Sequence, residues 1–373
     1  MRFLAKTFSG LENVLKDELV ALEAQNVEVQ TRAVSFEANK EILYKANYLL
    51  RTALRILLPL AEFTFEDVEQ YYEKIKQIEF ENYFDTSKTF NIDAVVKSTF
   101  FNNTHFAALK AKDAIVDRFR EKTGNRPNVD RSSSQIVVNV YVNENFCTVS
   151  LDMAGEPLYK RSYRHKATDA PLNEVLAAGI IGLSRWNKKT PFVDFMCGSG
   201  TLPIEAAMFA YNIPAQILRK NFSFFHFNDF DKSIWEKILK EAKQKQSAKF
   251  CDIRASDISP KAVDFAAQNM TNLGLSALID TKRYDFTKTK SDNPCHIVIN
   301  PPYWKRIEGQ NKNSVEDFYK AIGDTLKNNY KGSVAWIFTG NLQALKHIGL
   351  KHSEKIILFN GSIESRLVKY ELY

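Results

Sequence analysis

The sequence lacks the features that define several common protein classes. Its four cysteines lie about fifty residues apart, so they form no close pair that could clamp zinc. We therefore expect free thiols in a reducing cytoplasm and no metal site. Apolar runs such as 56–58 are interrupted by Pro59 and Glu62, far short of the roughly 20 residues of a membrane span. The N-terminus does not resemble a signal peptide. These absences predict a cytoplasmic protein with no membrane partner.

The composition that remains is that of a folded protein. Hydrophobic residues make up 45% of the 373 positions and charged residues 25%, which excludes disordered and collagen-like chains. At roughly 100–200 residues per domain, this length predicts two or three domains. The net charge of +7 suggests a polyanionic partner without establishing one. Residues 166–373 carry the excess, with 29 basic and 21 acidic side chains, whereas residues 1–165 are nearly neutral.

In the first half, short strands alternate with helices, which predicts small α+β units. A strand is expected over 3–8, and Ser9 with Glu12 forms a capping-box pattern that predicts a helix start. Residues 41–58 carry a helical pattern. Apolar and polar side chains alternate on both sides of a turn within 135–151, and this pattern predicts a β-hairpin.

From about residue 171 the pattern changes to short apolar strands alternating with helices. This rhythm is typical of a mostly parallel sheet with helices on both faces, an α/β fold. Such strands are expected at 192–195, 252–256, 278–283, 296–299 and 333–338. Two further strand patterns flank a turn at 360–362 and predict a closing hairpin, so the last strand should run antiparallel.

Acidic residues follow three of these strands and predict a ligand pocket. Asp194 ends the first strand and precedes a turn containing Gly198 and Gly200, which lets the backbone approach a ligand. The turn lacks the third glycine of a dinucleotide fingerprint and the Gly-Lys-Ser/Thr of a phosphate loop. Asp257 could accept both hydroxyls of a ribose, and Asp285 could accept an adenine amine. One such acid alone would be read as a helix cap, but together they predict a pocket for an adenosine with a sulfonium tail.

The fourth strand runs into Asn300, Pro301, Pro302 and Tyr303. The two prolines hold the backbone extended, so the Pro301 carbonyl projects at a defined angle. That carbonyl and the Asn300 side-chain oxygen can accept both hydrogens of an exocyclic amine. Tyr303 offers a ring for stacking a planar base, an interaction worth about 1–3 kcal/mol. The motif predicts methyl transfer by alignment, with no catalytic triad or metal.

These motifs resemble those of class I S-adenosylmethionine-dependent methyltransferases that act on planar amines. Over essentially its whole length the chain resembles bacterial 23S rRNA guanine-N2 methyltransferases with a THUMP domain, the N-terminal catalytic half of large-subunit rRNA methyltransferase L. The resembling segments are 9–12, 111–117, 126–131, 158–164, 170–174, 196–201 and 300–303. The resemblance implies a ferredoxin-like unit over 1–60, a THUMP domain over 61–157 and a Rossmann-like methyltransferase domain over 158–373.

The same resemblance implies the site residues. Asn300 to Tyr303 are the catalytic motif, and the segment from Thr168 to Asn173 covers the methionine end of S-adenosylmethionine. The full set of expected cofactor-binding residues is Thr168, Pro171, Leu172, Asn173, Asp194, Met196, Cys197, Gly198, Ser199, Gly200, Thr201, Asp257, Ile258, Asp285 and Phe286. Trp304 departs from the small residue that commonly follows the motif. Residues 212–250 are an insertion, which we expect to be helical.

Structured RNA is the implied partner, either 23S rRNA or a ribosome assembly intermediate. On charge alone, the basic stretch 110–131 is better read as a solvated helix face. The resemblance instead implies RNA contacts by Lys110, Lys112, Arg118, Arg126, Arg131, Arg161 and Arg164. A tRNA guanosine is the alternative substrate. A DNA adenine methyltransferase, a protein glutamine methyltransferase and an inactive RNA-binding module are less favoured readings of the same motifs.

Overall fold

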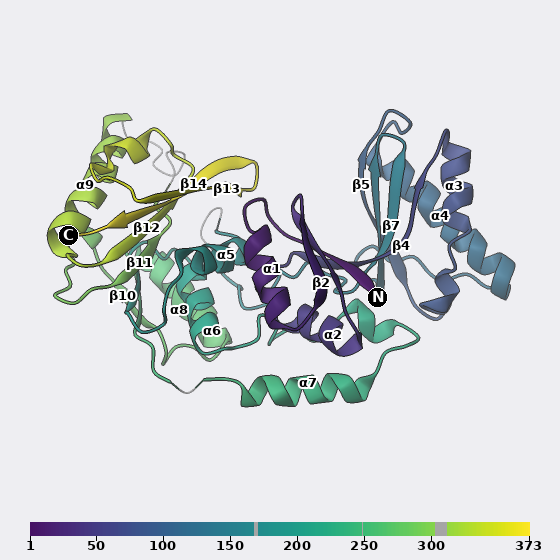
Figure 1. Ribbon diagram of the computed structural model, residues 1–373, viewed down its shortest axis with the longest axis horizontal. Helices are drawn as coiled ribbons and strands as arrows, with labels where there is room; N and C mark the ends of the chain where they lie inside the picture. Colours follow the sequence, from purple (N-terminus) through teal and green to yellow (C-terminus); the bar gives the residue numbers. More distant parts are fainter. Residues whose placement is uncertain (168–170, 248, 303–311) are drawn as a thin grey trace.

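The computed structural model describes residues 1–167, 171–247, 249–302 and 312–373, which form two halves (Figure 1). The helices are α1 (Glu12–Ala21), α2 (Lys40–Leu49), α3 (Val68–Lys76), α4 (Thr104–Thr123), α5 (Glu174–Ser184), α6 (Thr201–Ala210), α7 (Lys232–Gln244), α8 (Pro260–Asn272) and α9 (Lys312–Asn329). Short 3-10 helices include η1 (Phe80–Asn82), η2 (Ser223–His226), η3 (Phe286–Lys288) and η5 (Ala344–Ile348).

The strands divide between two sheets. The N-terminal sheet contains β1 (Arg2–Lys6), β2 (Gln25–Gln30), β3 (Ala33–Glu37), β4 (Arg55–Thr64), β5 (Phe90–Lys97), β6 (Ile136–Asn143) and β7 (Phe146–Asp152). The C-terminal sheet contains β8 (Phe192–Asp194), β9 (Ile253–Asp257), β10 (Asp280–Arg283), β11 (His296–Ile299), β12 (Val334–Thr339), β13 (Glu354–Asn360) and β14 (Ile363–Glu371).

One continuous sheet spans the N-terminal half, in the order β2-β3-β1-β4-β7-β6-β5. Strand β4 joins its two parts, because it pairs antiparallel with β1 on one side and with β7 on the other. The predicted hairpin over 135–151 is confirmed as β6 and β7. In Figure 1 this sheet passes from the centre to the right, where α3 and α4 lie beside β4 to β7.

The predicted helix over 41–58 is wrong in its second part. Helix α2 ends at Leu49, and Leu50 has an extended ψ of 131°. The carboxylate of Glu18 on α1 accepts hydrogen bonds from the backbone N–H groups of Arg51 and Thr52, at 3.1 and 3.0 Å. This contact from a distant part of the sequence ends the helix and turns the chain into β4.

The predicted capping box at Ser9 is also wrong. Helix α1 begins at Glu12, and its N-cap is Leu11, which makes no side-chain cap hydrogen bond. The Glu12 carboxylate instead accepts the N–H of Gly10 at 2.7 Å and that of Arg32 at 3.1 Å. It therefore ties the start of the helix to the β2–β3 turn.

The C-terminal sheet confirms the predicted α/β, Rossmann-like fold class. Its order is β10-β9-β8-β11-β12-β14-β13. Strands β10, β9, β8, β11 and β12 are parallel, while β14 pairs antiparallel with β12, as the sequence predicts. Within the described ranges, no helix is long and apolar enough to cross a bilayer.

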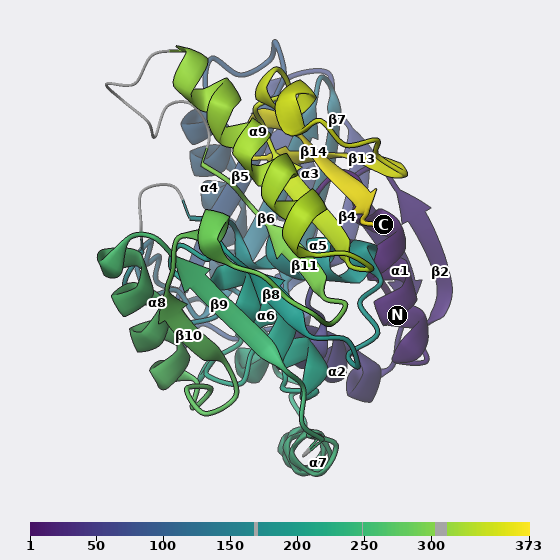
Figure 2. The ribbon, with the colours of Figure 1, turned by 90° about the vertical axis from the view of Figure 1, so that its left-hand side faces the viewer.

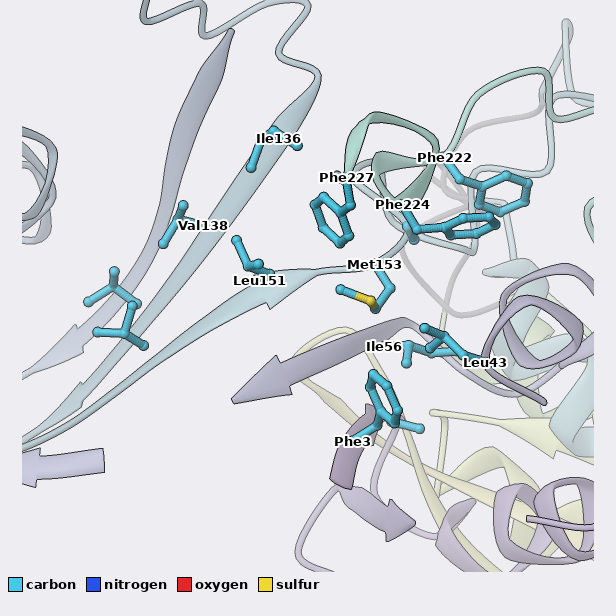
Figure 3. Packing of buried hydrophobic residues seen from close by; sticks show 14 of the residues in the cluster. Phe3, Leu43, Ile56, Ile136, Val138, Leu151, Met153, Phe222, Phe224 and Phe227 are labelled. Carbon is cyan, nitrogen blue, oxygen red and sulfur yellow. The ribbon is translucent and has the colours of Figure 1, made fainter. Parts of the chain in front are cut away.

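The insertion packs on the N-terminal half, although in the sequence it lies between α6 and β9 of the C-terminal half. It contains η2 and α7, and Phe222, Phe224 and Phe227 belong to the same buried cluster as Met153 and Phe3 (Figure 3). The ring of Phe224 stacks on Tyr44 of α2 with centroids 4.4 Å apart. Helix α7 lies along α2, below the rest of the molecule in both ribbon views (Figure 2). The insertion thus fastens the two halves together.

Replacing Phe224 by Ala should destabilise this junction. The side chain is 1% exposed, so its removal leaves a cavity, and we expect a loss of about 3–5 kcal/mol in the free energy of unfolding. Urea denaturation measures this loss. Phe250→Ala is the matched control, because Phe250 lies in the same insertion but is 77% exposed. Equal stabilities of the two variants would contradict the clamping role.

Candidate functional site

The ends of β8 and β11 meet at the point where the strand order of the C-terminal sheet reverses. Strand β8 continues along the chain to β9 on one side, whereas its other neighbour is β11. In open α/β sheets, ligands bind beyond the carboxyl ends of the strands at such a switch point. Asp194 is the last residue of β8, and Asn300 follows β11 directly. The topology therefore brings the two predicted motifs together.

The turn between β8 and α6 is built around two glycines in the left-handed region. Gly198 has φ of 54° and Gly200 has φ of 86°, conformations that favour glycine. A Cβ atom at Gly200 would lie 3.1 Å from the Cβ atom of Ala266, so α8 packs directly against the turn. The N–H of Gly198 donates to Asp257 at 3.0 Å. Helix α8 and the last residue of β9 therefore fix the position of the turn beside the carboxyl ends of the strands.

Asp194 is a buried carboxylate with a free acceptor. Its Oδ1 accepts the N–H of Met196 at 3.0 Å, whereas within the described structure its buried Oδ2 has no hydrogen-bond partner. Burial raises the pKa of Asp194 to about 8, and the nearby Asp257 carboxylate adds to the rise. A buried acceptor without a donor is costly, so this oxygen is suited to a cationic donor of a ligand.

Asn300 presents a second free acceptor to the same pocket. Its Oδ1 is buried and finds no donor among the described residues. The pocket is lined by Pro171, Leu172, Asp194, Met196, Cys197, Gly198, Ser199, Thr201, Leu202 and Asn300. Pro301 is buried and Pro302 is partly exposed. Thr168, Tyr303 and Trp304 lie outside the described residues. The pocket is thus bordered by both predicted motifs, and Leu202 is a lining residue that the sequence did not indicate.

Several predicted cofactor residues lie beside this pocket and serve local structure. Asn173 caps α5 by accepting the N–H groups of Val175 and Leu176. Asp257 uses one oxygen for Gly198 and the other for the N–H of Ser259 at 2.9 Å. Each carboxylate oxygen keeps a second lone pair for a ligand.

Asp285, the third predicted acid, also accepts local hydrogen bonds just after a strand. Asp285 caps η3, with its Oδ1 accepting the hydroxyl of Thr287 at 2.7 Å, and this hydrogen bond lowers the pKa of Asp285. Ile258 is 64% exposed, and Phe286 is half-buried against Phe318. The structure therefore gathers the glycine turn, Asp194 and Asn300 in one pocket and places the other two acids at neighbouring strand ends.

Comparisons with known proteins show the family of the chain. The pattern of the RMKL-like methyltransferase domain matches residues 161–369, more than half of the chain. The chain belongs to this methyltransferase family. Residues 65–152 match the THUMP domain, and residues 2–57 match the RlmL ferredoxin-like domain.

Three similar proteins extend the comparison. A candidate RNA methyltransferase of Synechocystis is 34% identical over all of this chain and 97% of its own length. Ribosomal RNA large subunit methyltransferase K/L of Syntrophotalea carbinolica is 32% identical over all of this chain, which spans 54% of that relative. The chain thus spans about half the length of the K/L relatives. A candidate methyltransferase solved with SAH superposes with a TM-score of 0.90 over all of this chain and 98% of its own, at 27% identity.

The predicted RNA contact by Arg161 is wrong. Arg161 is 2% exposed and forms an ion pair with Glu205 of the methyltransferase domain at 2.6 Å. Arg164 is also engaged internally, since it forms an ion pair with Glu174 at 3.1 Å with side chains only 16% and 9% exposed. Both arginines therefore act inside the protein.

Of the other basic residues expected to bind RNA, three interact with side chains of the protein and two are exposed without an ion pair in the described chain. Arg118 binds Glu81 and has a side chain only 12% exposed, so it is poorly placed for RNA. Lys112 pairs with Asp113 at 2.5 Å, and Lys110 lies over the ring of Tyr72. Arg126 and Arg131 are exposed, and no ion pair holds them in the described part of the chain.

Asp194→Asn should change how the stability of the methyltransferase depends on pH. The folded protein keeps Asp194 protonated up to about pH 8, whereas the unfolded chain releases that proton near pH 4. Between these values the folded state binds the extra proton, so the wild type loses stability as pH rises. The variant lacks this loss, and its free energy of unfolding relative to wild type should increase from pH 5 to pH 8. Urea denaturation measures the difference, and a constant difference would contradict the buried acid.

Proposed function

We propose that the protein is an S-adenosylmethionine-dependent methyltransferase that modifies the exocyclic N2 amine of a guanosine in 23S rRNA. The observation that carries this proposal is the buried, unpartnered Oδ1 of Asn300 in the pocket shared with Asp194. The large-subunit rRNA methyltransferases among the relatives support rRNA as the substrate class, and the THUMP domain supports an RNA partner. The guanine N2 position is supported by the resemblance of the 300–303 motif.

The residues present fit the cofactor. The free Asp194 Oδ2 would accept the ammonium of its methionine end. Asp194 is protonated below about pH 8 without the ligand, so it would release that proton when the cationic donor binds, because a nearby positive charge favours the carboxylate. Gly198 lines the pocket without a side chain, so a ligand could approach the backbone of the turn there. The free lone pairs of Asp257 and Asp285 would meet the ribose and the adenine. When bound, the cofactor supplies an electrophilic methyl group on a positively charged sulfur.

The chain's own groups then orient the accepting amine. Asn300 Oδ1 and the Pro301 carbonyl would each accept one hydrogen of the exocyclic amine, which aims the nitrogen lone pair at the methyl carbon. The amine would take up the methyl group and release one proton to solvent, which would leave the cofactor as a neutral thioether. Fixed acceptors stabilise the positive charge that develops on the nitrogen, and alignment of the two reactants supplies much of the acceleration. Tyr303 would stack on the base.

Asn300→Ala should greatly slow methylation while leaving cofactor binding intact. We expect turnover to fall by about two to three orders of magnitude, because the amine loses a fixed acceptor in the transition state. In cells lacking the gene, mass spectrometry of rRNA nucleosides should show loss of N2-methylguanosine. The wild-type gene should restore this nucleoside, and the Asn300→Ala gene should not.

The same measurement separates the alternatives. Loss of N2-methylguanosine from tRNA alone would favour the tRNA substrate, and loss of a methylated adenine from DNA would favour a DNA enzyme. No change in any pool would refute the proposal. Calorimetry with SAH tests the cofactor separately, because an inactive RNA-binding module would not bind it.

Arg131→Gln should weaken RNA binding by removing a positive charge that can bind phosphate. We expect a lower affinity for all structured RNAs and a shallower salt dependence, by about one unit in the log–log slope for each phosphate that the variant no longer binds. Filter binding of rRNA fragments at several salt concentrations measures both quantities. Arg185→Gln is the control, because Arg185 is equally a surface arginine but pairs with Glu354 in the methyltransferase domain. An unchanged slope for Arg131→Gln would remove Arg131 from the RNA interface.

A further inference from the structure

The segment after β7 that joins the two halves also touches both walls of the cofactor pocket. Arg164 in this segment donates from Nη2 to the carbonyl of Leu172 at 2.7 Å and to the hydroxyl of Thr201 at 3.0 Å. Leu172 and Thr201 line the pocket from different elements, the segment before α5 and the first turn of α6. One guanidinium therefore links two pocket residues that lie 29 positions apart in the sequence, Leu172 before α5 and Thr201 at the start of α6.

A second contact joins the same segment to the glycine turn. Asn269 of α8 is fully buried and accepts the N–H of His165 at 3.1 Å. Its amide donates to the carbonyl of Lys166 at 2.9 Å and to the carbonyl of Ser199 at 3.0 Å. Ser199 lies between the two glycines of the turn. Hydrogen bonds thus connect the joining segment to the glycine turn through Asn269, and to Leu172 and Thr201 through Arg164.

The segment itself is firmly anchored just before these contacts. Arg161 is paired with Glu205 of α6, and the hydroxyl of Tyr163 donates to the same carboxylate at 3.0 Å. All three side chains are buried. The backbone just before Arg164 is therefore held in place, and displacing the Arg164 side chain would break its own ion pair with Glu174, which is costly inside the protein.

We propose that Arg164 is a positioning residue that shapes the cofactor pocket before the cofactor binds. Arg164 is not among the residues that line the pocket, and it acts through Leu172 and Thr201, which are. Holding the walls in place lowers the ordering cost of binding, so the gain appears as cofactor affinity. The inference rests on the cofactor named under the proposed function and is independent of which RNA nucleotide is methylated.

An arginine suits this role better than a lysine does. Its Nη2 nitrogen belongs to a rigid planar group, and from one position it donates to the Leu172 carbonyl and the Thr201 hydroxyl and lies 3.1 Å from the Glu174 carboxylate. A lysine keeps the positive charge beside Glu174, but its ammonium ends a flexible stem and no planar group fixes its position between the two pocket residues. Arg164→Lys therefore keeps the positive charge but loses the planar group that positions the donor. Arg164→Gln loses both the charge and the planar guanidinium.

The test measures SAH affinity by calorimetry on the full chain, together with KM for S-adenosylmethionine, kcat at saturating cofactor and the melting temperature without ligand. We expect roughly tenfold or more weaker SAH binding and a matching rise in KM for Arg164→Gln, with kcat within about threefold of wild type. Arg164→Lys should fall between the two. Arg185→Gln, a surface ion-pair arginine with a 73% exposed side chain, should bind SAH like wild type.

A folded Arg164→Gln protein whose Kd and KM stay within about twofold of wild type would overturn the proposal. So would a fall in kcat with unchanged Kd. If Arg164→Gln does not fold, Arg164→Lys decides, and wild-type affinity in that variant overturns the proposal. Failure of the wild-type protein itself to bind SAH would instead refute the cofactor assignment.

Discussion

A buried ion pair between Arg161 and Glu205 ties together the parts of this protein. The two side chains are 1% and 0% exposed and lie 2.6 Å apart, and burial raises the pKa of Glu205. Arg161 also donates to the carbonyl of Arg51 in the N-terminal half. Removing one partner of such a pair would leave a charge uncompensated in the interior, at a cost of about 3–5 kcal/mol. The pair fixes the joining segment, α6 and the N-terminal half relative to one another.

Arg51 of the N-terminal half also holds α6, at the C-terminal end of the helix. Its guanidinium donates to the carbonyls of Met208 and Ile213 at 3.0 and 2.7 Å, in the last turn of the helix and just beyond its C-terminus. Burial lowers the pKa of Arg51 to about 10, so it stays protonated at neutral pH. The helix is thus held at its end by the N-terminal half and at its start by Arg164. The orientation of α6 in turn sets the glycine turn and one wall of the pocket.

Much of the catalytic half was predictable because its signals are local. The central strands β8, β11 and β12 are short and mostly apolar, and parallel strands place their carboxyl ends at one edge of the sheet. The proximity of Asp194 and Asn300 therefore follows from the strand pattern, although they are far apart in sequence. The antiparallel last strand was predictable from its turn for the same reason.

The parts that sequence patterns missed depend on distant partners. The end of α2 at Leu49 depends on Glu18, which lies on another helix. Arg161 stands among polar and basic residues that look solvent-exposed, and its partner Glu205 is 44 positions away. The insertion was recognisable as extra chain, but its docking on Tyr44 is set by tertiary packing. None of these contacts has a local signature.

We propose that the pocket between Asp194 and Asn300 holds the methyl donor. A crystal structure of the protein with SAH tests this most directly. We predict the ligand's ammonium within hydrogen-bond distance of Asp194 Oδ2 and its sulfur facing Asn300. SAH bound elsewhere, for example in the cavity lined by Phe250, Met270 and Thr281, would contradict the account.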